Sequence, residues 1–164
     1  MSVLIRPVTS TDARSALEVH HAAVHVTAAR DYNSSILEEW ARLPITDEAV
    51  EQFNANPEKE VRLVAEWAGK VAGFAAVVPS NSELRACYVS PEAAGRGIGR
   101  ALVSVLERIA VREGVTSLWL HASLTAHPFY EAVGYKTEGH GEHVLRSVQR
   151  MACVYMRKTL IPSI

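Results

Sequence analysis

The sequence predicts an α/β protein in which helices flank a single mixed sheet whose strands are mostly antiparallel. Three observations support this fold class. Apolar residues recur at helical spacing over residues 12–30, strand-like runs joined by short turns occupy residues 61–89, and a long amphipathic segment over residues 98–110 is followed by further strand-like runs. Because this long helix joins the two strands on either side of it, we expect those strands to run parallel through a right-handed crossover.

The first third of the chain is predicted to be mainly helical. Residues 3–8 alternate loosely as a first strand and stop before the helix-capping run 9–12. We expect a long helix over residues 12–30 and two shorter helices over residues 35–43 and 47–53.

The middle of the chain is predicted to form an antiparallel meander of three strands, over residues 61–67, 71–78 and 83–89. Gly69-Lys70 has the composition of a two-residue hairpin turn, and residues 79–82 supply the second turn. The run 71–78 is almost entirely apolar, so we expect this strand to be covered on both faces.

The last part of the chain alternates between helix and strand. The helix over residues 98–110 presents Ile98, Leu102 and Leu106 on one face, and Gly114 is a natural C-terminal stop for it. The remaining elements are expected in this order: a strand at 117–122, a helix at 125–133, and strands at 135–138 and 151–158.

The composition is that of an ordinary globular protein. With 164 residues, 48% of them hydrophobic and 21% charged, the chain is predicted to be one domain over residues 1–164. A formal net charge of -1 gives no broad basic field for nucleic acid or an anionic membrane. The longest apolar run is too short to span a bilayer, the N-terminus has no apolar signal core, and Cys87 and Cys153 form no CxxC pair. We therefore expect a cytoplasmic protein with buried free thiols and no nucleic-acid or membrane partner.

The most informative segment is Ala94-Gly95-Arg96-Gly97-Ile98-Gly99, between a strand and the long helix. Its three alternating glycines leave main-chain N–H groups uncovered by side chains, and the helix start adds unpaired donors and partial positive charge. This combination is typical of phosphate binding. A dinucleotide-binding loop is disfavoured, because Arg100 stands where that fingerprint requires a third glycine and no acidic residue ends a strand about twenty residues later.

The glycine loop and one later motif resemble the GNAT superfamily of acetyl-CoA-dependent N-acetyltransferases. The family's loop has the form Gln/Arg-x-x-Gly-x-Gly/Ala, which residues 94–99 match except that Ala94 replaces the long polar residue. The second motif, Ala-x-x-x-Tyr-x-x-x-Gly-aromatic, matches residues 126–135. The position three before Ala126, often Asn in the family, is Ser123 here. Two motifs in the right order are far more specific than either alone.

The resemblance implies a GNAT-like fold with a central splay between the strand before the loop and the strand after the long helix. Acetyl-CoA would enter this splay as co-substrate. The residues implied in holding it are Cys87, Tyr88 and Val89 through their backbone, Gly95, Arg96, Gly97, Ile98, Gly99 and Arg100 through their amides, and Ser123 at the far wall. Either Arg96 or Arg100 would add charge near the 3′-phosphate.

Two residues are predicted to take part in acetyl transfer. Tyr130 is the candidate general acid for the departing thiolate, since a phenol donates a proton at neutral pH; the alternative is an aromatic ring that only packs under its helix. Glu83 is the candidate general base, because it lies eleven positions before Ala94, the spacing of the base in histone-type members of the superfamily. Strand alternation would place Glu83 on the same face as Cys87. Its alternative is an ordinary ion pair with Arg85.

Other polar residues carry further alternatives. Cys87 has no His–Asp partners in the pattern and is interpreted as core rather than as a nucleophile. His21 and His25 are one helical turn apart, a spacing that can chelate, but no third ligand is evident, so no metal site is predicted. Several residues are candidate acceptor contacts by resemblance, each also interpretable as a surface or structural residue: His20, His25, Asp31, Tyr32, His140, His143 and Arg146.

The sequence thus predicts an N-acetyltransferase that moves an acetyl group directly from acetyl-CoA to a primary amine, with a small molecule as the first choice of acceptor. Acetylation of a protein N-terminus or lysine is an alternative acceptor class. A non-catalytic acyl-CoA-binding sensor is the alternative from a different functional class. A homodimer is a further expectation, since superfamily members often pair through their final strands and helices.

Overall fold

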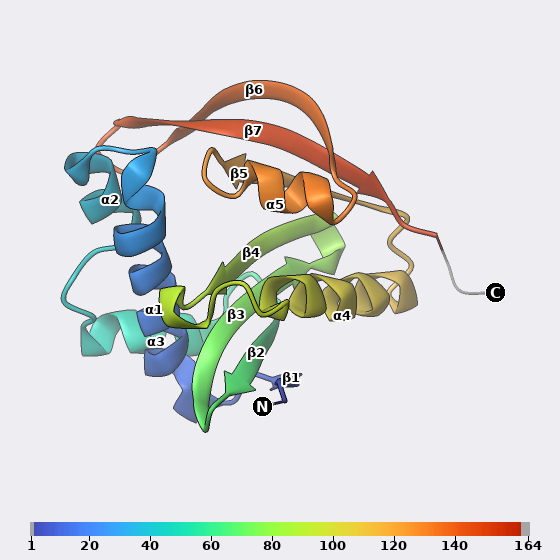
Figure 1. Cartoon of the computed structure of the whole chain (residues 1–164), viewed down its shortest axis with the longest axis horizontal. Coiled ribbons are helices and arrows are strands. Elements are labelled where there is room, and N and C mark those ends of the chain that lie inside the picture. Colours follow the sequence, from blue (N-terminus) through green and yellow to red (C-terminus); the bar gives the residue numbers. More distant parts are fainter. Residues whose placement is uncertain (1, 162–164) are drawn as a thin grey trace.

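The computed structural model describes residues 2–161 and contains a seven-stranded sheet in the order β1-β2-β3-β4-β5-β7-β6 (Figure 1). Every neighbouring pair is antiparallel except β4 and β5, which run parallel across the long helix. The elements are β1 (Leu4–Pro7), α1 (Ala13–Ala22), α2 (Ser34–Trp40), α3 (Asp47–Ala55), β2 (Val61–Trp67), β3 (Lys70–Val78), β4 (Glu83–Val89), α4 (Ile98–Arg112), β5 (Ser117–Ser123), α5 (His127–Ala132), β6 (Lys136–Val144) and β7 (Arg150–Thr159). The predicted mixed α/β class is confirmed.

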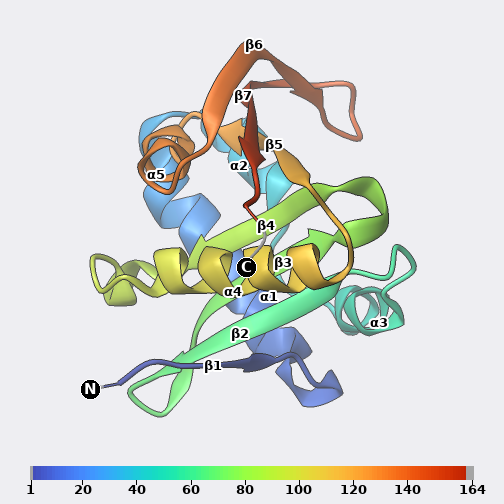
Figure 2. The same cartoon turned by 90° about the vertical axis from the view of Figure 1, so that its right-hand side faces the viewer.

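Helices cover both faces of the sheet (Figures 1 and 2). Helix α4 packs on one face, where Leu102 and Leu106 are fully buried, and α1 packs on the other, against Phe74 of β3. Strand β3 is therefore buried on both sides, as its apolar sequence predicted. Helix α4 packs closely on β3 at Gly73, where an added Cβ atom would lie 2.9 Å from side-chain atoms of both Ile98 and Leu102. This close approach fixes the start of α4 against the sheet.

Several predicted boundaries were wrong. The helix predicted over residues 35–43 ends at Trp40. The first hairpin turn is Ala68-Gly69, with φ of 55° and 80°, and Lys70 already belongs to β3. These two positive φ values fit the twist of a two-residue hairpin better than the predicted Gly69-Lys70 turn. The predicted helix 12–30 leaves α-helical geometry after Ala22 and continues as a π-turn at Ala23–Thr27 and a 3-10 turn. Strand β6 runs to Val144, well past the predicted end at residue 138, because pairing with β7 overrides its polar, glycine-containing sequence.

The sheet divides between β4 and β5. Strand β4 pairs with β3 along its length and β5 pairs with β7 along its length, but β4 and β5 share one paired position, Glu83 with Trp119. A bulge accompanies this division, because Val77 lies opposite Leu84 and Ala76 opposite Ala86, which leaves Arg85 without a partner on β3. A bulge bends its strand and increases the local twist. The two halves of the sheet therefore diverge beyond Glu83.

A buried carboxylate anchors β1 to the start of the first helix. Asp12 accepts hydrogen bonds from Arg6 Nη1 at 2.7 Å and from the main-chain N–H of Thr9 at 2.7 Å. Arg6 also donates from Nε to Glu66 Oε2 at 2.7 Å. The hydrogen bonds from Arg6 hold the pKa of the Asp12 carboxyl well below its usual range.

We predict that Asp12→Asn lowers the free energy of unfolding by about 1–3 kcal/mol near neutral pH, since it removes a charged acceptor from buried donors. Because the pKa of Asp12 is lower in the folded state, its carboxylate stabilises the fold at pH values above its pKa in the unfolded state, about 3.9. This stabilisation is lost as the pH falls toward the pKa in the folded state. The difference between parent and variant should therefore shrink on acidification from about pH 5 to about pH 2. Urea unfolding across this range measures it.

Asp47→Asn is the matched control, since Asp47 pairs with Arg14 while its side chain is 97% exposed. This variant should change stability by less than about 0.5 kcal/mol. An Asp12→Asn protein as stable as the Asp47→Asn protein at neutral pH would contradict the anchoring role of Asp12.

Candidate active site

A cavity of about 440 Å³ opens where β4 and β5 diverge. Its walls come from the π-turn after α1, from the C-terminal half of β4, from the glycine loop and from the end of β5. Residues with predicted cofactor roles make up much of this lining: Cys87, Tyr88, Val89, Gly95, Gly97, Ile98, Gly99, Arg100 and Ser123. The fold thus brings these residues, predicted separately along the sequence, to one cavity.

The main chain of β4 has free hydrogen-bonding groups on its cavity side. Ser90 N–H donates to Ala72 O at 2.8 Å, which sets the alternation of the antiparallel ladder between β4 and β3. Tyr88, two residues away, lies in the same phase and directs its main-chain groups to β3. Cys87 and Val89 lie in the opposite phase, so their N–H and C=O groups point toward the gap beside β5. This edge can accept an extended ligand as an added strand.

The glycine loop adds a second set of unused donors. Gly95 and Gly97 have φ of 76° and 77°, a left-handed conformation that L side chains rarely adopt. Gly97 is the N-cap of α4, and its carbonyl accepts from Ala101 N–H at 3.0 Å. Across residues 2–161, no main-chain N–H from Gly95 to Arg100 donates to another protein group. These donors, at a helix N-terminus, form an anion-binding cradle that suits a pyrophosphate.

The two arginines of the loop differ in position. Arg100 lines the cavity and donates to Ala132 O at 3.3 Å. The guanidinium of Arg96 stacks on the ring of Trp67, 4.2 Å from its centroid, outside the cavity. Of the two candidates for a charge contact to a phosphate, the side chain of Arg100 is the one placed at the cavity.

A second cavity, of about 240 Å³, adjoins the first at the same splay. Cys87, Tyr88, Ser123, Ala126 and Trp40 line both cavities, so the two meet between β4 and β5. The second cavity also contains most of the chemistry-bearing side chains: Glu83, Arg85, His121, Tyr130, His143 and Cys153. A ligand in the first cavity and a ligand in the second would therefore approach one another through the gap in the sheet.

Tyr130 lies on α5 and borders the second cavity. Its side chain is buried against Phe129 and Tyr135, with ring centroids 5.1 Å and 5.8 Å away. Its hydroxyl forms no hydrogen bond with another residue of the described chain. Burial raises the pKa of Tyr130 well above its ordinary value, so the phenol stays protonated at neutral pH. A protonated hydroxyl without a partner is available to donate to a ligand.

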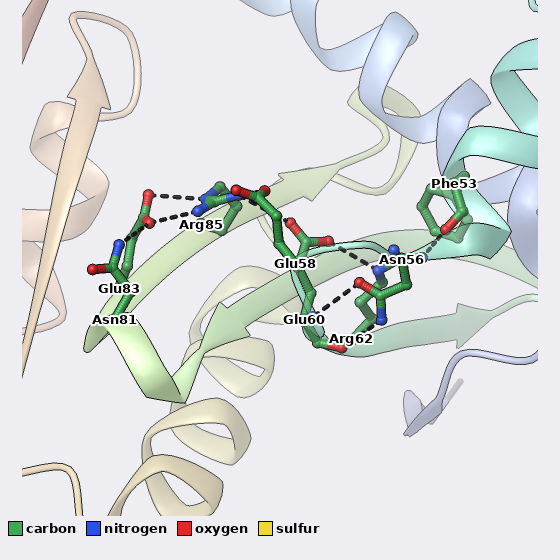
Figure 3. A network of polar contacts seen from close by, with 8 residues as sticks. All are labelled: Phe53, Asn56, Glu58, Glu60, Arg62, Asn81, Glu83 and Arg85. Carbon is green, nitrogen blue, oxygen red and sulfur yellow. Dashed lines mark hydrogen bonds and ion pairs between the residues drawn. The ribbon is translucent and has the colours of Figure 1, made fainter.

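Glu83 is engaged by its neighbours (Figure 3). Arg85 donates to both carboxylate oxygens, from Nε at 2.9 Å and from Nη2 at 2.7 Å, and Asn81 Nδ2 donates at 2.9 Å. Arg85 also pairs with Glu58 and with Glu60, which join it to the segment before β2. The ion pair considered as the alternative for Glu83 is therefore present. The base role stays a prediction.

The expected alternation along β4 was wrong at one point. Glu83 and Cys87 were placed on one face by counting every second residue, but the bulge at Arg85 reverses the parity between them. Leu84 and Cys87 now share the face that packs under α4, while Ala86 and Tyr88 face α1. Glu83 consequently faces the side of Tyr88. Glu83 still lines the second cavity, because residues from both faces of β4 border it.

The side chains of Cys87 and Ser123 both contact nearby groups of the protein main chain. The Cys87 thiol lies 3.9 Å from Gly99 O, and burial raises its pKa to about 12, so it is a neutral thiol rather than a nucleophile. Ser123 Oγ accepts from Ala126 N–H at 3.1 Å and caps the turn that leads into α5. Ser123 thus sets the direction of the helix that carries Tyr130.

Of the three histidines between residues 20 and 25, His21 and His25 have hydrogen-bond partners, whereas the buried Nε2 of His20 has none within residues 2–161. His21 contacts the main-chain oxygens of Leu17 and Arg42, and His25 contacts that of Ala41 at 2.6 Å, which ties this helix to the end of α2. His20 is packed 4.4 Å from the ring of Tyr88, and burial lowers its pKa to about 3. Among residues 2–161, no three His, Cys, Asp or Glu side chains converge on a point that would hold a metal ion.

The remaining candidate acceptor contacts are divided. His143 lines the second cavity, whereas His140 is exposed beside His127 and lines neither cavity. Tyr32 joins the segment after α1 to β7 and to the end of β5. Its hydroxyl donates to Ala152 O at 2.5 Å and accepts from Leu124 N–H at 2.8 Å. Asp31 accepts from Thr125 Oγ1 at 2.6 Å beside it.

Among the cavity residues that the sequence prediction missed are Trp40 of α2 and His121 of β5. His121 lies on the face of β5 opposite the buried Leu118 and Leu120. His121 could have been predicted, because it is a histidine on the polar face of a strand that borders the expected splay. Trp40 gave no comparable signal, because its helix is placed by tertiary contacts.

None of the helices within residues 2–161 has the length and apolarity needed to cross a bilayer.

Curated relatives match a short part of the chain. A putative acetyltransferase of Bacillus subtilis is 42% identical over 41 residues, which cover 25% of this chain and 28% of the relative. An uncharacterized acetyltransferase of Streptococcus pyogenes is 44% identical over 45 residues, 27% of this chain and 32% of the relative. The matched segments thus span about a third or less of these relatives.

Solved structures match nearly the whole chain. A GCN5-related N-acetyltransferase from Rhodopseudomonas palustris has a TM-score of 0.87 and 26% identity, covering 98% of this chain and 97% of that one. PaiA N-acetyltransferase from Thermoplasma acidophilum, solved in complex with coenzyme A, has a TM-score of 0.75 and 22% identity, covering 97% and 99%. The second comparison supports the fold.

The family comparison covers the cavity-forming part of the molecule. Residues 24–135, from the π-turn to the end of the Tyr130 motif, match the model of the acetyltransferase (GNAT) family. This chain therefore belongs to the GNAT family of acetyltransferases, whose members use acetyl-CoA as co-substrate.

Proposed function

We propose that this protein, as one N-acetyltransferase domain over residues 1–164, transfers the acetyl group of acetyl-CoA directly to a primary amine of a small molecule. The observation that carries the proposal is the meeting of two cavities at the splay, with Tyr130, whose hydroxyl has no hydrogen-bond partner within residues 2–161, in the lining of the second. The second cavity measures about 240 Å³, a volume that suits a small acceptor.

The residues of the first cavity fit the coenzyme. The amides from Gly95 to Arg100 would bind the pyrophosphate, and Arg100 would contribute charge near the 3′-phosphate. The free main-chain groups of Cys87 and Val89 would pair with the pantetheine arm, and the side chain of Tyr88 would form the cavity wall. These contacts position the thioester at the gap in the sheet, and alignment alone accounts for a large part of acyl-transfer rates.

Tyr130 would act on the leaving group. The bound coenzyme supplies a reactive thioester, whose sulfur leaves as a thiolate when the amine displaces it. A buried, protonated phenol next to that sulfur would donate the proton that the thiolate needs. Location in the cytoplasm, pairing into a homodimer and the base role of Glu83 stay predictions.

The proposal is tested by titrating the protein with acetyl-CoA in a calorimeter and by assaying thiol release with a panel of small amines. We expect saturable binding and amine-dependent thiol release. Binding without thiol release on any small amine or lysine-containing peptide would favour an acyl-CoA sensor. Release on the peptide alone would move the acceptor to the protein class. Absence of binding would overturn the proposal.

Arg100→Gln should weaken acetyl-CoA binding about fivefold, a loss of about 1 kcal/mol, because it removes a charge near the 3′-phosphate. Affinity for dephospho-acetyl-CoA, which lacks that phosphate, should be unaffected. Arg108→Gln is the control, since Arg108 is exposed on the same helix and donates to Ser104. An equal loss with both forms of the coenzyme would contradict the assignment.

Tyr130→Phe should lower kcat roughly 10- to 100-fold and leave the affinity for acetyl-CoA unchanged, because only the proton donor is lost. Steady-state kinetics and calorimetry measure the two effects. Tyr135→Phe is the matched control, since it removes a buried tyrosine hydroxyl that donates to Glu107 at 2.9 Å, away from the splay. If both variants lose kcat equally, the effect is structural and Tyr130 is not the acid.

A further inference from the structure

One carboxylate and two imidazole side chains meet on the acceptor side of the splay. Glu83 of β4, His121 of β5 and His143 of β6 all line the second cavity, which Tyr130 also borders. The three come from three different strands, so the topology of the sheet brings them together. Only Glu83 was expected to have a role in proton transfer.

Glu83 is poorly placed to accept a proton from an amine. Arg85 donates to both of its carboxylate oxygens, and Asn81 donates to one of them as well. Arg85 is itself held by Glu58 and Glu60 (Figure 3). Protonating Glu83 would weaken these hydrogen bonds. Proton transfer to Glu83 is therefore less favourable than transfer to a base without such partners.

In the described part of the chain, His121 is held in position without hydrogen bonds to its ionisable atoms, in contrast to Glu83. Its ring is held in place between Trp119, 5.0 Å away, and Tyr155, 4.5 Å away between ring centroids. Trp119 is anchored in turn, since its Nε1–H donates to Asn81 O at 2.8 Å. Within residues 2–161, however, neither imidazole nitrogen of His121 has a hydrogen-bond partner. A ring fixed by stacking, with free nitrogens at a cavity, can accept a proton from a ligand.

We propose that His121 is the general base that deprotonates the acceptor amine. This inference rests on the proposed acetyl transfer. It gives Glu83 a supporting role, in which its fixed negative charge stabilises the imidazolium that forms.

The ionisable groups around His121 are consistent with this role. Burial, as the largest cause, lowers the pKa of His121 from its ordinary value; nearby Glu83 raises it and His143 lowers it. From β7, Tyr155 contacts the ring, and the ion pair of Arg157 with Glu138 lies two register positions away, opposite Trp119. The imidazole is therefore mainly neutral at neutral pH, the state that a base requires.

The proton balance closes with these residues. An amine that arrives as an ammonium ion gives one proton to His121, and its lone pair then forms the C–N bond with the thioester carbonyl carbon. The C–S bond breaks, its electron pair leaves on sulfur, and Tyr130 donates a proton to that sulfur. After attack the nitrogen loses a second proton, which passes through water to the Tyr130 phenolate and restores the phenol. His121 releases the first proton to solvent.

The first test compares the dependence of kcat/KM on pH in the parent, His121→Asn and Glu83→Gln. The parent should lose activity at acidic pH with an apparent pKa below the ordinary histidine value of about 6.5. His121→Asn should abolish this acidic limb and lower kcat roughly 100-fold. Glu83→Gln should keep the limb and move it to lower pH, because removing the negative charge makes the imidazolium less stable.

The second test uses a pair of probe amines of similar shape, ethylamine and 2,2,2-trifluoroethylamine. The fluorine atoms make the second amine largely neutral at neutral pH, so it does not need an initial base. His121→Asn should lose at least tenfold more activity on ethylamine than on trifluoroethylamine, whereas a merely structural defect would lower both equally. His140→Asn is the control, because His140 is exposed on β6 and lines neither cavity.

The outcomes separate this inference from the proposed function. A parent protein that binds acetyl-CoA and acetylates ethylamine, while His121→Asn retains the acidic limb, overturns the role of His121 alone. Loss of the limb in Glu83→Gln or His143→Asn, with retention in His121→Asn, would assign the base to that other residue. A parent that binds no acetyl-CoA or releases no thiol with either amine would overturn both proposals.

Discussion

The site depends on one interruption in the sheet. Strands β4 and β5 are neighbours in the strand order, yet they share a single paired position, Glu83 with Trp119. A regular sheet would continue this pairing and leave no space between the strands. The bulge at Arg85 bends β4 away, and the pairing of β5 with β7 holds β5 in the other half of the sheet. The two cavities exist because these two strands separate.

The separation also creates the binding groups. A buried strand edge normally has its N–H and C=O groups paired, because an unpaired buried group costs free energy. Cys87 and Val89 keep theirs unpaired at the gap between β4 and β5, and the loop from Gly95 to Arg100 keeps a further set at the start of α4. Close packing of α4 on Gly73 aligns that loop with the mouth of the gap. A single elongated ligand with a phosphorylated end and an amide-containing arm would satisfy both sets.

Much of this arrangement could be predicted from local sequence. Strand β4 has the predicted bounds, and the glycine loop and the long amphipathic α4 follow from glycine spacing and helical periodicity. The bulge at Arg85 could not be predicted, because nothing in its neighbours distinguishes a bulged residue from a paired one. Missing it put Glu83 and Cys87 on one face. His121 was missed for a related reason: its importance comes from the strand that lies beside it, which local periodicity does not report.

Amide hydrogen exchange along β4, measured by NMR with and without acetyl-CoA, tests the central claim most directly. If the coenzyme pairs with the open edge of β4, exchange at the N–H groups of Cys87 and Val89 should slow on binding. Exchange at Tyr88, whose N–H is directed to β3, should change little. Binding that protects only the glycine loop, or protects Tyr88 as strongly as its two neighbours, would contradict the account.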